Sequence, residues 1–116
     1  MKDYRELSYH SDDNLTLYAR DYGSPDARTI VLCMHGLTRN SADFERLCLE
    51  LKSEYRLIAI DVRGRGNSEY DSEIGNYHPA RYVQDVYSLI ELLKAGGTNL
   101  DNLVLLGTSM GGSWRC

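Results

Sequence analysis

Residues 103–112 read LVLLGTSMGG, and this stretch decides the fold of the 116-residue chain. Its four leading apolar residues have the length of one buried parallel strand. The pentapeptide GTSMG at 107–111 follows at once, with a glycine two positions before and two positions after Ser109. Where a strand turns directly into a helix, the backbone at the apex is strained, and glycines leave the room that nearby side chains would fill. The pattern therefore predicts a strand, a tight turn with Ser109 at its apex, and a helix that begins at Met110.

Further strands are expected earlier in the sequence. Residues 4–21 predict an antiparallel hairpin, because two arms flank the polar turn cluster SDDN at 11–14. Two apolar runs, 29–34 and 56–61, predict buried strands.

Two segments between these strands have the apolar spacing of a helix packed on a sheet. The first is 41–51, for which Asn40 or Ser41 can serve as the N-cap. The second begins at Pro79 and ends at the glycine pair 96–97. Its expected apolar face consists of Tyr82, Val83, Val86, Leu89, Ile90 and Leu93. A hairpin followed by alternating strands and helices predicts an α/β fold with a parallel sheet and helices on its faces.

Three polar residues lie at the ends of the expected parallel strands, namely His35, Asp61 and Ser109. In open sheets of this kind, functional sites lie beyond the carboxyl ends of the strands. We therefore expect these residues to converge on one edge of the sheet.

Composition limits the classes of function. At most one domain is expected, and 42% hydrophobic with 26% charged residues is typical of a soluble globular protein. The net charge of −4 argues against nucleic acid or an anionic membrane as a partner. The N-terminus lacks the apolar core of a signal peptide, so a cytoplasmic protein is expected. Cys33, Cys48 and Cys116 lack metal-ligand spacing and predict reduced packing thiols, with no metal site.

Three motifs at strand ends carry a resemblance to a known family: HG at 35–36, DVRGRGNS at 61–68 and GTSMGG at 107–112. In this order the chain resembles the α/β-hydrolase superfamily. It looks most like the compact branch of esterases, proline iminopeptidase-like peptidases and haloperoxidase-like enzymes. The resemblance implies the N-terminal portion of an α/β-hydrolase fold, in which an antiparallel hairpin precedes parallel strands with flanking helices.

The same resemblance assigns roles to three residues. Ser109 would be the nucleophile that forms an acyl-enzyme with a small ester, amide or related carbonyl substrate, without a cofactor. The backbone N–H groups of Leu37 and Met110 would bind the oxyanion. One such donor is typically worth roughly 3 kcal/mol of transition-state stabilisation. Serine at the apex differs from the aspartate of the epoxide hydrolase and dehalogenase members.

Other interpretations of these motifs stay open. His35 can be the catalytic base, but a local hydrogen bond that holds the oxyanion loop is the favoured role, because the base in this fold follows the nucleophile. Asp61 can be the triad acid or, as we favour, a cap for the turn after its strand. The GRG at 64–66 resembles a phosphate loop but lacks the third glycine of a nucleotide-binding module. Arg63 and Arg65 are expected to be structural or solvated charges.

In the resembling family, the acid and the histidine of the triad follow the nucleophile, whereas the three histidines of this sequence precede Ser109. We therefore expect residues 1–116 to be an incomplete core domain without a cap domain, truncated just after the nucleophile elbow and inactive alone. Residues 113–116, SWRC, also depart from the family pattern of small and apolar residues. The alternative is a non-catalytic, truncated or degenerate α/β-hydrolase.

Overall fold

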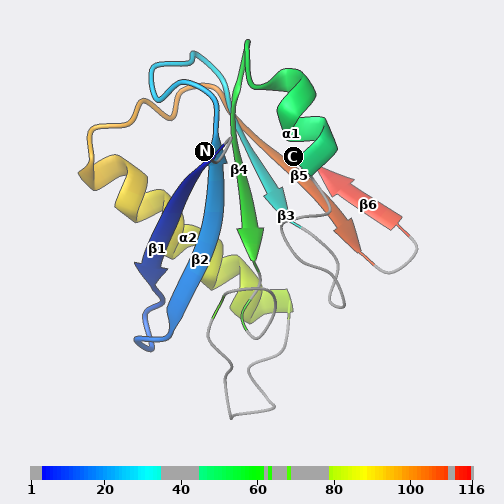
Figure 1. Ribbon diagram of the computed structural model, residues 1–116. Helices are drawn as coiled ribbons and strands as arrows, with labels where there is room; N and C mark the ends of the chain where they lie inside the picture. The colour runs from blue at the N-terminus through cyan, green and yellow to red at the C-terminus, as the bar shows by residue number, and fades with distance from the viewer. Residues whose placement is uncertain are drawn as a thin grey trace.

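The computed structural model describes residues 4–34, 45–61, 63, 68, 79–109 and 112–115. The strands are β1 (Arg5–His10), β2 (Thr16–Tyr22), β3 (Ile30–Met34), β4 (Arg56–Asp61), β5 (Leu103–Ser109) and β6 (Gly112–Arg115). The helices are α1 (Glu45–Leu51) and α2 (Pro79–Ala95). Within these residues the six strands form one sheet in the order β1-β2-β4-β3-β5-β6 (Figure 1).

The sheet has an antiparallel part and a parallel part. β1 and β2 form a hairpin, and β2 also pairs antiparallel with β4. β3 lies between β4 and β5 and runs parallel to both. The expected hairpin and the expected parallel strands are therefore confirmed.

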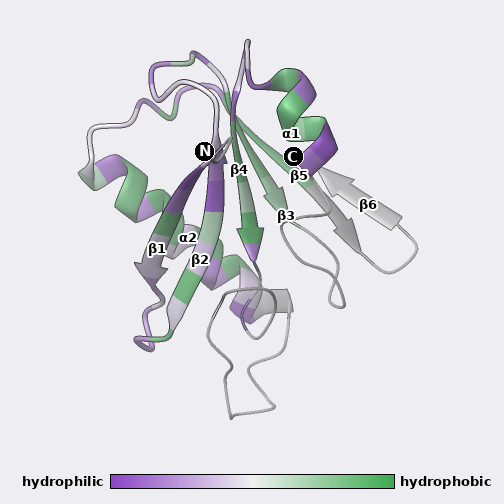
Figure 2. Ribbon diagram, viewed as in Figure 1, coloured by the Kyte–Doolittle hydropathy of each residue, from purple (hydrophilic) through white to green (hydrophobic). Residues whose placement is uncertain are grey.

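α1 and α2 cover opposite faces of the sheet (Figure 1). Successive residues of a strand point to opposite faces, so a central strand supplies side chains to both cores. In β4, Ile58 and Ile60 pack in the core with α2, while Leu57 and Ala59 pack in the core with α1. All six residues of β4 are buried, and Figure 2 shows the hydrophobic colour along β3 and most of β4.

The core beneath α1 contains two free cysteines, Cys33 on β3 and Cys48 on α1. A hydrogen bond to Cys48, together with burial, raises the pKa of the Cys33 thiol. Both are packing thiols, as the sequence predicts, whereas Cys116 lies outside the described residues.

α2 ends at the glycine pair that the sequence indicates. Gly97 has a φ of +85°, the left-handed conformation that glycine adopts without a steric penalty. Its N–H donates to the Lys94 carbonyl at 3.0 Å, and the Thr98 N–H donates to the Leu93 carbonyl at 3.0 Å. These two bonds form a Schellman motif, which satisfies carbonyl groups of the last turn.

Two helix predictions differ from the structure. Val83 was expected on the apolar face of α2, but its residue is 45% exposed. The buried positions Tyr82, Val86, Leu89 and Leu93 follow the helical repeat, and Val83 lies about 100° away from Tyr82. α1 is described from Glu45 onward, so the predicted N-caps Asn40 and Ser41 lie outside the described residues.

The prediction of a helix that continues after Ser109 is wrong for residues 112–115. β5 extends to Ser109, and β6 pairs antiparallel with it in a register from Leu106 opposite Arg115 to Ser109 opposite Gly112. An outer strand edge presents unpaired N–H and C=O groups, which β6 satisfies along part of β5. A first helical turn, by contrast, has a costly nucleus. Pairing at the edge therefore prevails over helix formation.

Candidate active site

The parallel register brings the carboxyl ends of three strands to one edge of the sheet. Met34, the last residue of β3, is opposite Ile60 on one side and Gly107 on the other. Asp61 follows Ile60 directly, and Ser109 lies two residues beyond Gly107. The ends of β4 and β5 therefore flank the point where the chain leaves β3, and the expected convergence is confirmed for Asp61 and Ser109.

The other predicted site residues are described only in part. His35, Leu37 and Met110 lie outside the described residues, and Ser109 is described as the last backbone position of β5. His10 is exposed on β1. The roles of Ser109, Leu37 and Met110 stay predictions.

Ser68, which follows β4 in the sequence, forms hydrogen bonds with two strands of the sheet. Its hydroxyl donates to the backbone carbonyl of Asp61 at 2.6 Å. The same oxygen accepts the backbone N–H of Tyr18 on β2 at 2.9 Å. Ser68 thus bridges β2 and the end of β4. The Asp61 residue is 2% exposed, so its carboxylate is held inside the protein.

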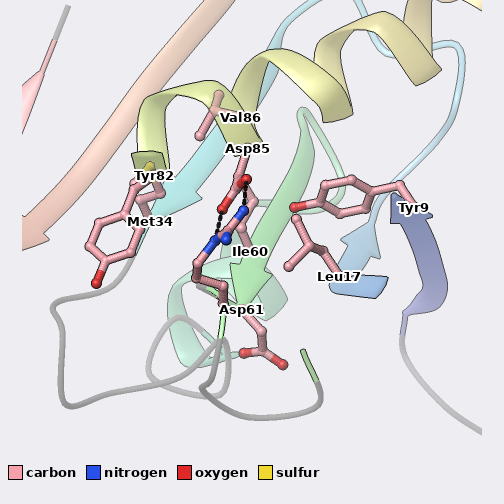
Figure 3. A pocket seen from close by; sticks show the side chains of 9 residues that line it. Tyr9, Leu17, Met34, Ile60, Asp61, Tyr82, Asp85 and Val86 are labelled. Carbon is pink, nitrogen blue, oxygen red and sulfur yellow. Dashed lines mark hydrogen bonds and ion pairs between the residues drawn. The ribbon is translucent and has the colours of Figure 1, made fainter. Parts of the chain in front are cut away.

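Arg63 is held by two carboxylates from distant segments. Its Nε and Nη2 donate to the two oxygens of Asp85 on α2, at 2.7 and 2.6 Å (Figure 3). Its Nη1 and Nη2 also donate to Asp13, in the β1–β2 turn, at 3.2 and 3.3 Å. The Arg63 side chain is completely buried. It is a structural charge, as expected, and it joins the hairpin turn, the end of β4 and α2.

Arg81 extends this charge cluster toward the surface. It donates to Asp12 and, at 2.8 Å, to Asp13, and its Nε lies 3.7 Å from an oxygen of Asp85. The hydrogen bonds from Arg63 are the main reason that the pKa of Asp13 is lowered to about 2. The Asp13 carboxylate is therefore ionised at neutral pH.

Sequence reasoning missed Asp13 and Asp85 as partners of Arg63. Asp85 nevertheless has a signal, because it lies three residues after Tyr82 and four before Leu89 on the buried stripe of α2. A carboxylate on a buried stripe requires a cation or hydrogen-bond donors opposite it.

A small cavity lies beside this cluster, below the carboxyl edge of the sheet. Its volume is about 10 Å³, and its polar lining comes from Tyr9, Asp61, Arg63 and Asp85. Around these groups the wall is apolar, with Leu17 among the lining residues (Figure 3).

The described ranges contain neither a metal-binding cluster nor a membrane-spanning helix. No group of three or more His, Cys, Asp or Glu side chains in this part of the chain can hold a metal ion. No helix within the same ranges is long and apolar enough to cross a membrane.

Comparison with known proteins identifies similar hydrolases. The family model described as serine aminopeptidase, S33, matches residues 25–116. The chain is 37% identical over 92 residues to a 3-hydroxybutyrate-oligomer hydrolase of Cupriavidus necator. The alignment covers 79% of this chain and 30% of the relative. It is 36% identical over 97 residues to a 2-(acetamidomethylene)succinate hydrolase of Mesorhizobium japonicum. This alignment covers 84% of this chain and 31% of the relative. The chain thus spans about a third of the length of these curated relatives.

A solved structure extends the similarity to three dimensions. An α/β hydrolase from Novosphingobium aromaticivorans aligns with a TM-score of 0.76 and 31% sequence identity. The alignment covers 91% of this chain and 45% of that chain.

Proposed function

The chain belongs to the serine aminopeptidase S33 family of α/β-hydrolases, and we propose that it carries the nucleophile and oxyanion loop of a serine-dependent hydrolase. The bond that the whole enzyme cleaves is an ester, an amide or a related carbonyl bond. Both curated relatives described above are named as hydrolases, which supports this reaction class.

The observation that carries the proposal is the position of Ser109. It is the central residue of GTSMG and the last residue of β5, at the edge where β4 also ends. A serine at this edge of a parallel sheet supports the proposal, because a nucleophile elbow presents its hydroxyl above the sheet at this edge, beside backbone N–H donors.

In the proposed reaction, the Ser109 Oγ attacks the carbonyl carbon of the substrate while a histidine removes its proton. The backbone N–H groups of Leu37 and Met110 stabilise the oxyanion that develops. The leaving group departs with a proton, and water then hydrolyses the acyl-enzyme. The charge cluster of Arg63 takes no chemical part in these steps. Its role is structural, because it joins the hairpin turn, the end of β4 and α2.

Labelling with a fluorophosphonate probe tests the nucleophile. In the full-length protein we expect one covalent adduct on Ser109, identified by peptide mass spectrometry and lost in Ser109→Ala. Ser88→Ala is the matched control, because the Ser88 hydroxyl donates a hydrogen bond within α2, to the Gln84 carbonyl at 3.3 Å. An unlabelled full-length protein, or a label that survives Ser109→Ala, would contradict the proposal.

A second candidate is a non-catalytic chain, and β6 favours it for residues 1–116 alone. A nucleophile elbow requires a strand followed by a helix, whereas β5 is followed by an antiparallel strand that pairs Ser109 with Gly112. On this hypothesis the 116-residue chain reacts with the probe no faster than its Ser109→Ala variant. Rapid, stoichiometric labelling of the 116-residue chain would eliminate the second candidate.

A further inference from the structure

Tyr9 has a hydroxyl group whose burial has no evident compensation. The residue is 3% exposed, and its oxygen has no hydrogen-bond partner among the residues that the structure describes. Burial raises the pKa of Tyr9, and the charges of Asp85 and Asp61 raise it further, so the group is a neutral O–H donor. A buried hydroxyl without a partner is destabilising, and native proteins satisfy nearly all such groups with protein or water.

The cavity beside Tyr9 has the size of one water molecule. It measures about 10 Å³, close to the minimum of roughly 10 Å³ that a single water needs. In Figure 3 the Tyr9 hydroxyl points toward Asp85. The cavity is therefore a small, partly open space beside an unsatisfied donor.

The lining supplies the partners that a water requires. A buried water typically makes two to four hydrogen bonds. Tyr9 supplies a donor, and the carboxylate of Asp85, which is 5% exposed as a residue, supplies acceptors. A dry cavity is typical of a purely apolar lining, whereas this lining includes the polar groups of Tyr9, Arg63 and Asp85.

A cation is a poorer occupant than water. The guanidinium of Arg63 also lines the cavity, and it already neutralises Asp85 through two hydrogen bonds. Arg81 adds a second positive charge 3.7 Å from the same carboxylate. A neutral molecule that both accepts and donates fits this balance of charge.

We propose that this cavity is a binding site for one structural water, which accepts the Tyr9 hydroxyl proton in a hydrogen bond and donates to the carboxylate of Asp85. The water links β1 to α2. It therefore completes a polar layer near the carboxyl ends of β3 and β4, and it does not depend on the role of Ser109.

Replacement of Tyr9 by phenylalanine tests the site energetically. If the hydroxyl binds a water, Tyr9→Phe removes a satisfied hydrogen bond, and the folding equilibrium constant of the full-length protein falls roughly ten-fold in urea denaturation. Tyr87→Phe is the matched control, because Tyr87 is 58% exposed on α2 and the same substitution there leaves stability unchanged.

The opposite result is equally definite. If the cavity is dry, Tyr9→Phe removes an unsatisfied buried hydroxyl, so stability stays the same or rises, and the proposal is overturned. A crystal structure of the wild-type protein gives the second readout. Electron density for one water within hydrogen-bond distance of the Tyr9 oxygen is the expected result. Empty density, or a direct bond from Tyr9 to a carboxylate, also overturns it.

Discussion

Arg63 is the largest fully buried side chain in the described part of the chain. A buried guanidinium is tolerated only when its donors and its charge are matched. Two hydrogen bonds to Asp85 and two to Asp13 supply that match. The cluster therefore fixes where the hairpin turn and α2 lie relative to the end of β4.

Removal of the Asp85 charge is expected to be strongly destabilising. Asp85→Asn replaces the buried carboxylate partner of Arg63 by a neutral amide and leaves Asp13, which is more exposed, as the remaining carboxylate. The loss of one member of a buried ion pair typically costs about 3–5 kcal/mol. Urea unfolding followed by circular dichroism measures this free energy.

The control is an exposed pair on α1. Arg46 and Glu50 lie 3.7 Å apart with side chains 94% and 66% exposed. Arg46→Ala should change the free energy of unfolding by about 0.5 kcal/mol or less. Equal effects of Asp85→Asn and Arg46→Ala would show that the buried pair has no special role.

Asp13 makes the stability of the cluster depend on pH. Its pKa is lowered from 3.8 to about 2 in the folded protein, so the folded state favours the ionised form. The resulting stabilisation is fully present above the unfolded pKa and is lost as pH falls through about 2. The free-energy difference between wild type and Asp13→Asn should therefore shrink as pH falls below 3.8. Urea unfolding at a series of pH values measures it, and a pH-independent difference would contradict the assignment.

The partners of Arg63 show what single-residue patterns cannot reveal. The sequence places Arg63 just after a strand, but Asp85 and Asp13 are 22 and 50 positions away. No local spacing links such residues, and only the packing of α2 and the hairpin around β4 brings them together. Cys33 and Cys48 were predictable as buried thiols, because each has an apolar local context.

At the scale of the element, glycine at position 97 is required by the backbone of the α2 terminus. Gly97 has a φ of +85°, but a Cβ there would meet no atom within 4 Å. Gly97→Ala should therefore destabilise the protein by about 1 kcal/mol through backbone strain alone. Thermal unfolding of the variant measures this effect.

Gly96 provides the neighbouring control. A Cβ on Gly96 would lie 3.6 Å from the carbonyl oxygens of Leu92 and Leu93, which is ordinary contact. Gly96→Ala should change stability by less than about 0.5 kcal/mol. If both alanine variants melt alike, the left-handed conformation of Gly97 is not what terminates the helix.

Most elements follow from local patterns, and β6 does not. The hairpin, β3, β4 and the end of α2 are each specified by alternation, apolar runs or a glycine pair in their own sequence. The chain after Ser109 is decided by the edge of β5, which offers backbone partners to a strand but not to a helix. A long-range edge of this kind has no signature in GTSMGG.

At the scale of the whole molecule, topology explains why the location of the site could be predicted from the sequence but the polar contacts around it could not. Parallel strands that alternate with helices have their carboxyl ends on one side, so Asp61 and Ser109 were expected at one edge. The cavity beside Tyr9 could not be predicted from the sequence, because it forms where β1, β4 and α2 meet. The location of a site thus follows from strand order, whereas its polar layer follows from packing.

The position of each strand in the sheet also predicts where the molecule opens first. β4 is buried at all six positions and pairs with β2 on one side and β3 on the other. β1 is outermost at its side of the sheet, and only Tyr9 of its six residues is buried. Amides of β4 should therefore exchange hydrogen only through global unfolding, with a protection free energy equal to that from urea unfolding, whereas β1 exchanges through local opening. Hydrogen exchange followed by mass spectrometry or NMR measures both. Equal protection of β1 and β4 would mean that the Arg63 cluster, through Asp13, locks the hairpin into the same cooperative unit as the central strands.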